Sequence, residues 1–197
     1  MGTRGTIQVY LDGRQVIKQY NQWDSQPTGQ FEHICRIVAC GNKRAKLIDR
    51  LRHTVLMSKE ETERLAELRD NPEKICFTAG DLSALRDLAN FTVLANRDWG
   101  AEILDYVLCM NHCGRYGDTY RDEDGTEISI LYRMVDWGYI FNEDGLLLPQ
   151  EGNYRLYLTG DGQYTLTGYW HGVLRTWTNE VPTYKELEEW TEEGYKE

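Results

Sequence analysis

The chain has 197 residues, of which 41% are hydrophobic and 27% are charged, and this balance favours a globular protein over a disordered one. Its formal net charge of −10 repels nucleic acid at long range, which argues against general DNA or RNA binding. No apolar run approaches the roughly 20 residues that span a bilayer, and no secretory segment follows the start, so we expect no membrane association. Five cysteines without an export signal are typical of reduced thiols, so we predict a cytoplasmic protein.

The first predicted elements are two β-strands that form a hairpin. Residues 6–11 alternate apolar and polar side chains, and residues 14–20 form the returning strand. Asp12-Gly13 between them is a strong two-residue turn signal. Because two strands alone are marginally stable in water, we expect this hairpin to join strands from later in the chain.

The middle of the chain has helical periodicity. Apolar side chains recur at i, i+3, i+4 and i+7 from Phe31, and Gly41 has the character of a helix stop. A capping box at residues 58–61 and apolar spacing at 97–110 predict further helices. The helical part therefore extends over about residues 31–113.

Strand patterns return in residues 118–180. β-branched and aromatic side chains dominate there, and Asp-Gly pairs supply turns between the segments. The predicted strands cover residues 126–135, 137–142, 153–159, 163–170 and 172–178.

A terminal helix follows, because Thr183 and Glu186 have the spacing of a capping box. The elements together predict an α+β fold with an N-terminal β-hairpin (6–20), a helical middle, a C-terminal antiparallel β-sheet and the terminal helix. We find no internal repeat and no linker, so a single domain over residues 1–197 is favoured.

The loop after the hairpin, "QYNQWDSQPTGQF" at residues 19–31, is the first candidate site. Trp23 could stack on a ligand, and Asp24 could accept a hydrogen bond or act as a base. With Tyr20 and Arg4 nearby, this interpretation gives an enzyme that acts on a small molecule or an amide.

A structural turn explains the same loop. In that interpretation Asp24 caps local backbone amides, Pro27 fixes one dihedral angle and Gly29 takes a positive one. The sequence alone leaves both interpretations open, although the turn is the commoner use of these residue types.

The stretch "CMNHC" carries three side chains of the kind that bind zinc, namely Cys109, His112 and Cys113. A closed tetrahedral site needs a fourth ligand, and no second Cys/His pair is adjacent in the sequence. Only the fold could supply one from Cys76, His53 or His171. The simpler interpretation is a helix end with two ordinary cysteines, and we predict neither a metal nor another cofactor.

Two acidic blocks, at residues 118–127 and in the tail, are candidate interaction surfaces. Carboxylates on a fixed scaffold can imitate phosphates and occupy a basic channel, whereas most such runs are solvated surface. Six Trp and thirteen Tyr could add aromatic anchors. The predicted binding residues are Trp23, Asp118, Asp122, Glu123, Asp124, Trp170, Trp177, Tyr184, Glu188, Glu189, Trp190, Glu192 and Glu193.

Four stretches, "GTRGTIQVYLDG", "QYNQWDSQPTGQ", "NRDWGAEILDYV" and "VDWGYIFNEDGLLL", together resemble an uncharacterised family of bacteriophages, prophages and bacteria with relatives in fungi. The family pattern has a G-x-R-G start, a Y-x-Q-W-D-x-x-P-x-G loop and a later W-x-Y-x-x-D strand. This chain departs from it at Gln30-Phe31, where the pattern has a second glycine, and at residues 142–144. The resemblance implies a phage or prophage setting but no mechanism.

Three functions follow as hypotheses. The first is a non-enzymatic accessory protein that inhibits a host defence or nucleic-acid-handling complex, as an anti-CRISPR does, within the bacterial host cytoplasm. Its partner would be a host protein or ribonucleoprotein with a basic groove. The second is the enzyme with its site at the Tyr20–Trp23–Asp24 loop, and the third is a structural or homo-oligomeric module.

Overall fold

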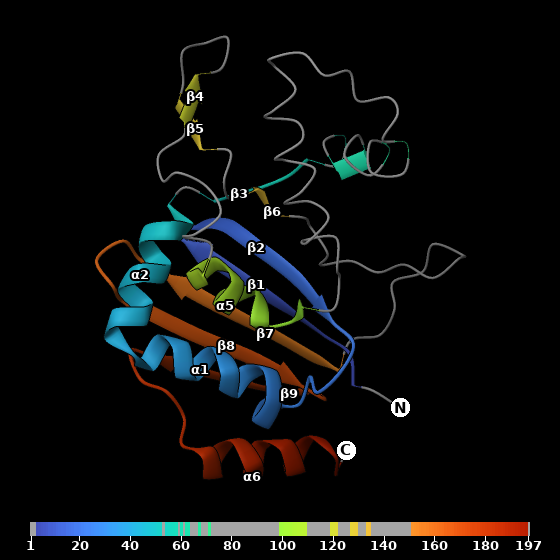
Figure 1. Cartoon of the computed structure of the whole chain (residues 1–197). Helices are drawn as coiled ribbons and strands as arrows, with labels where there is room; N and C mark the ends of the chain where they lie inside the picture. Colours follow the sequence, from blue (N-terminus) through green and yellow to red (C-terminus); the bar gives the residue numbers. More distant parts are fainter. Residues whose placement is uncertain are drawn as a thin grey trace.

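The centre of the structure is a five-stranded β-sheet built from both ends of the chain. The computed structural model describes residues 3–52, 54–58, 60, 62–63, 67, 71, 99–109, 119–121, 127–129, 133–134 and 151–196. The strand order is β2-β1-β7-β8-β9 (Figure 1). The strands are β1 (Gly5–Leu11), β2 (Arg14–Asn21), β7 (Gly152–Leu158), β8 (Tyr164–Trp170) and β9 (Val173–Thr178).

The hairpin joins the later sheet, as predicted, and it does so through a parallel pair. β1 and β2 are antiparallel, and the turn residues Asp12 and Gly13 have φ angles of 49° and 81°, which is the backbone of a tight two-residue hairpin turn. On its other side β1 runs parallel to β7, from Gly5 opposite Gly152 to Leu11 opposite Leu158. The sheet is therefore mixed, with an antiparallel meander β7-β8-β9 on one side.

Helices cover one face of this sheet (Figure 1). They are α1 (Glu32–Ala39), α2 (Gly41–Leu51), α5 (Glu102–Cys109) and α6 (Tyr184–Gly194), with a short π-helical turn η1 (Pro27–Phe31) before α1. The predicted stop at Gly41 is wrong by one residue, because the extended residue is Cys40 (φ −81°, ψ 105°) and Gly41 begins α2.

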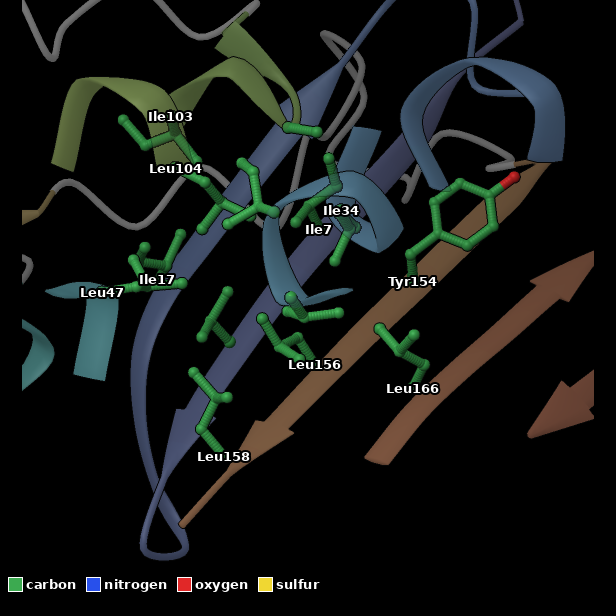
Figure 2. Packing of buried hydrophobic residues seen from close by; sticks show 14 of the residues in the cluster. Ile7, Ile17, Ile34, Leu47, Ile103, Leu104, Tyr154, Leu156, Leu158 and Leu166 are labelled. Carbon is green, nitrogen blue, oxygen red and sulfur yellow. The ribbon is translucent and has the colours of Figure 1, made fainter. Parts of the chain in front are cut away.

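The core lies between the sheet and these helices (Figure 2). Alternate residues of each strand point to the helices, so β1 and β7 contribute Ile7 and Leu156 while α1 and α5 contribute Ile34 and Leu104. All four are at most 1% exposed. Burial of each such side chain stabilises the fold by about 1.5–3 kcal/mol.

The opposite face of the sheet has polar and aromatic pairs. Tyr10 and Tyr157 stack with their ring centroids 4.8 Å apart across the parallel β1–β7 pair. The Gln8 side chain donates to Asn153 Oδ1 at 3.3 Å. These cross-strand contacts reinforce the parallel register.

Helix α6 closes the far side of the core with an aromatic cluster. Its predicted capping box is present, because the Thr183 hydroxyl accepts from the Glu186 amide and the Glu186 carboxylate accepts from the Thr183 amide. Trp190 lies with its ring centroid 5.3 Å from that of Phe31 and 6.2 Å from that of Tyr154. The helix is thus fixed against β7 and β8 by large buried rings.

Two short strand pairs complete the described residues. β3 (Val55–Leu56) runs parallel to β6 (Arg133–Met134), and β4 (Thr119–Arg121) pairs with β5 (Glu127–Ser129). The predicted strand at 137–142 lies outside the described residues. The predicted α+β fold class is confirmed. Within the described part of the chain, no helix has the length and apolar character needed to cross a membrane.

Candidate functional site

The buried side chain of Asn21 forms hydrogen bonds within the loop between β2 and α1. This side chain is 3% exposed, and its amide nitrogen donates to the Trp23 carbonyl and, at 2.8 Å, to the Ser25 hydroxyl. Asp24 has a φ of 54°, a left-handed backbone that Asp and Asn adopt more readily than most residues. Its carbonyl accepts from the Gln30 amide at 3.2 Å.

The same loop is held by the N-terminal segment. The Ser25 amide donates to the Thr3 hydroxyl at 2.8 Å, and the Tyr154 hydroxyl donates to the Ser25 carbonyl. A Cβ at Gly5 would lie 2.7 Å from Ser25 Oγ, and one at Gly152 would lie 2.6 Å from the Ser25 carbonyl oxygen. Both positions therefore need glycine, because the loop packs directly on the two strand ends.

The other side of the loop sets the start of α5. Gln30 Oε1 accepts from the Ala101 amide at 2.5 Å, and the Gly100 amide donates to the Tyr20 carbonyl at 3.3 Å. Gly100 has a φ of +53°, and a Cβ there would lie 2.4 Å from Gln30 Oε1. Segments about 70 to 80 residues apart in the sequence thus meet here through one hydrogen bond between backbone groups and one to the Gln30 side chain.

These contacts favour the structural interpretation of the loop. Tyr20 is 1% exposed and belongs to the core, and the Arg4 amide donates to Glu151 Oε2 at 2.6 Å, so Arg4 helps to fix the start of β7. Trp23 is 57% exposed at the loop tip beside Asp24. One detail of the turn prediction is wrong, because the positive φ is at Asp24 while Gly29 lies in the π-helical turn, where a Cβ would clash with the Asp24 carbonyl at 2.3 Å.

The predicted acidic tail is the outer face of α6. Leu187 and Trp190 are at most 1% exposed, whereas the side chains of Glu188, Glu189, Glu192 and Glu193 are exposed. Two of these are in ion pairs: Glu189 with Lys185 at 3.6 Å and Glu193 with Arg175 at 2.5 Å.

Two exposed tyrosines flank this row of carboxylates. Tyr184 at the first turn of α6 is 58% exposed, and Tyr195 just after the helix is 60% exposed. In the first turn of α6, the hydrogen bond from the Thr183 amide lowers the pKa of the Glu186 carboxyl most, and the bond from the Thr183 hydroxyl lowers it further. We define the acidic face of α6 as the following residues: Glu188, Glu189, Glu192, Glu193, Tyr184 and Tyr195.

Two predicted aromatic anchors are part of the core. Trp170 and Trp190 are both 0% exposed, so the prediction that they contact a partner is wrong. Gly168 lies opposite Tyr154 and leaves the space that the Trp190 ring fills. Gly194 does the same for Trp170, because a Cβ there would lie 2.3 Å from Trp170 Cδ1. Trp177 is half-buried with its ring centroid 5.6 Å from that of Trp190.

The predicted zinc ligands are only partly described. Cys109 is exposed at the end of α5, and His171 lies in the β8–β9 turn against Tyr195. In the described ranges, no three His, Cys, Asp or Glu side chains form a group that could hold a metal ion. The other candidate zinc ligands lie outside the described residues: His53, Cys76, His112 and Cys113. The predicted binding residues of the first acidic block also lie outside them: Asp118, Asp122, Glu123 and Asp124.

An open cavity between α1 and α5 was not predicted. His33 Nε2 lies 2.6 Å from Asp105 Oδ2 there, and Cys109 is also part of the lining. A sequence signal existed on α5, where Glu102, Asp105 and Cys109 repeat at helical spacing. The contact with His33 had none, because it joins positions 72 residues apart.

Comparison with models of protein families, with curated proteins and with solved structures found no match to this chain.

Proposed function

We propose that the chain is a non-enzymatic phage or prophage accessory protein that binds and inhibits a host nucleic-acid-handling complex, in the manner of an anti-CRISPR. The acidic face of α6 is the proposed contact surface. The phage setting comes from the family resemblance of the sequence motifs, and the mode of binding comes from the surface.

The observation that carries the proposal is a row of exposed carboxylates on a helix that buried side chains anchor to the sheet. Trp190 and Leu187 fix α6 to the sheet, and the capping box at Thr183 fixes its first turn. A contact surface that is rigid before binding loses less conformational entropy when a partner arrives.

The composition of the acidic face supports a protein partner with a basic groove. Carboxylates steer a basic surface by long-range attraction, and they set orientation more than they add affinity. The tyrosines at both ends, Tyr184 and Tyr195, supply aromatic contact area at low entropy cost. The helix thus combines steering charges with aromatic contacts.

A capture experiment with charge-matched variants tests the proposal. The tagged protein is exposed to nuclease-treated lysate of a bacterial host at about 0.1 M salt, where the Debye length is about 10 Å. Glu188→Lys and Glu192→Lys are compared singly with Asp49→Lys on α2, which is also exposed. Each substitution changes the net charge from −10 to −8, so global charge is matched.

We expect a nucleic-acid-handling protein to be captured by the unsubstituted chain and by Asp49→Lys, and to be depleted with both glutamate variants. Raising the salt should release it, because the Glu188 and Glu192 carboxylates are exposed. Equal capture by all three variants, or capture of no such protein, would contradict the proposal.

A further inference from the structure

The cavity between α1 and α5 has two carboxylates, two aromatic rings, a histidine and a cysteine among its lining residues. Its volume is about 340 Å³, at the small end of the roughly 300–1,000 Å³ that ligand pockets have. One lining residue comes from α1, one lies three residues before α5, and four come from α5. They are His33, Trp99, Glu102, Asp105, Tyr106 and Cys109.

Helix α5 forms this wall because it has two distinct stripes. Its apolar stripe, which includes Leu104 and Val107, is buried in the hydrophobic core. The pocket stripe has Glu102, Asp105 and Tyr106 at i, i+3 and i+4, so these side chains lie together on another side of the helix. The helix therefore places two carboxylates and one aromatic ring around the same cavity, whose lining surface is mostly apolar.

His33 holds one of these carboxylates in place. Its Nε2 lies 2.6 Å from Asp105 Oδ2, and the two side chains are 25% and 46% exposed. A carboxylate offers about four lone-pair sites, so Asp105 can accept from a ligand while it contacts His33. Glu102, one turn earlier on α5, is exposed and lines the same cavity.

Aromatic rings form the other part of the lining. The ring centroids of Trp99 and Tyr106 are 5.6 Å apart with an interplanar angle of 42°. Aromatic faces attract cations through their quadrupole, with Trp the strongest. Carboxylates and aromatic faces on one cavity are the combination that recognises an organic cation.

We propose that this pocket binds the guanidinium group of an arginine side chain presented by a peptide or protein. A guanidinium is planar, stacks on aromatic rings and forms forked hydrogen bonds with a carboxylate, whereas an ammonium is a compact and strongly hydrated point charge. The small volume fits one side chain. The pocket shares no residue with the acidic face of α6.

The test is a titration with N-acetyl-arginine amide, followed through the Trp99 indole signal in ¹⁵N NMR spectra. The Trp99→Phe variant assigns that signal among the six tryptophans of the chain. N-acetyl-citrulline amide is the matched neutral ligand, since it has the same shape without the charge. Asp105→Asn and Glu102→Gln probe the pocket, and Glu180→Gln, at an exposed position between β9 and α6, is the control with the same change in net charge.

We expect the arginine ligand to shift the Trp99 signal to saturation, and the citrulline ligand to bind at least about tenfold more weakly. Asp105→Asn should weaken arginine binding by about tenfold, Glu102→Gln should weaken it less, and Glu180→Gln should leave it unchanged. Free L-arginine should bind no more tightly than the amide, because the α-ammonium and α-carboxylate that it adds carry no net charge together. Thermal unfolding followed by circular dichroism verifies that each variant is folded.

Three results would overturn the inference: equal binding of the citrulline and arginine ligands, equal weakening by Glu180→Gln and Asp105→Asn, or no movement of the Trp99 signal. Tighter binding of free L-arginine than of its amide would overturn the assignment to an arginine presented by a peptide.

Discussion

Replacing Gly168 by alanine should destabilise the fold through the aromatic cluster that holds α6. A Cβ at this position would lie 2.3 Å from Trp190 Cη2 and 3.0 Å from Tyr154 Cδ1. Real Cβ atoms do not approach other atoms that closely, so a ring must move. Both rings are 0% exposed, so neither has free space to enter.

The expected cost is near the upper end of the range for overpacking, about 2–3 kcal/mol. For a chain of this length, each kcal/mol lowers the melting temperature by about 2–4 °C, so the shift should be roughly 4–12 °C. Urea unfolding followed by circular dichroism measures the free energy, and thermal unfolding measures the shift.

Gly41→Ala is the matched control. Its Cβ would meet nothing within 4 Å, and the residue begins helix α2 without a positive φ. We expect a change within about 0.5 kcal/mol, or a stabilisation of up to about 1 kcal/mol, because alanine favours a helix over glycine.

The origin of the cost can be assigned by a double-mutant cycle with Trp190→Phe. The smaller ring leaves room for the alanine methyl, so the double variant should be more stable than the sum of the single effects implies, by at least about 1 kcal/mol. If Gly168→Ala is as mild as Gly41→Ala, or if the two effects are additive, the packing argument for α6 is wrong.

Three other predictions follow from local geometry. Thr183→Ala should lower the free energy of unfolding by about 1 kcal/mol and weaken its dependence on pH in the acid range. The Thr183 hydrogen bonds lower the folded pKa of Glu186, so the stabilisation from this carboxylate is complete above the unfolded value of 4.5 and is lost as the pH falls through the lower folded pKa. Unfolding measured between about pH 3 and 6 shows whether the variant has lost this dependence. Burial, and to a smaller extent the Glu32 carboxylate, raises the pKa of the Cys35 thiol to about 12. In the native protein Cys35 should therefore resist alkylation while the exposed Cys109 reacts, and peptide mass spectrometry measures both rates. Equal rates would contradict this. Asp24→Asn should leave the melting temperature within about 2 °C, and Asp24→Val should cost about 1–2 kcal/mol because of the φ of 54°; equal stability of the two variants would refute the turn.

The sequence predicted elements whose signals are local. The Asp12-Gly13 hairpin, the capping box at Thr183 and the strands of the β7-β8-β9 meander all follow from residues a few positions apart. Each has a physical requirement, such as a positive φ or an unsatisfied amide, that few residue types meet.

Long-range pairings had no comparable signal. The parallel contact of Gly5 with Gly152 joins the N-terminal hairpin to the β7-β8-β9 meander, and hydrophobic alternation alone does not choose a partner strand. His33 and Asp105 meet only because α1 and α5 pack on the same face of the sheet.

The burial of the tryptophans could have been predicted. Trp190 follows Leu187 by three residues on α6, which places both on one helical face, and Trp170 alternates in phase with Leu166 on β8. A role as surface anchors is inconsistent with that periodicity. The exposed side chains of the same helix include the glutamates, which the sequence predicted as a surface.

The most direct test of the proposed function is site-specific photo-cross-linking inside a bacterial host. A photoreactive phenylalanine analogue is placed at Glu192 on the acidic face of α6 or at Asp49 on α2, both exposed positions. The account predicts a cross-link from position 192 to a basic nucleic-acid-handling protein, and none to that protein from position 49. Cross-linking to the same protein from both positions, or none from position 192, would contradict the account.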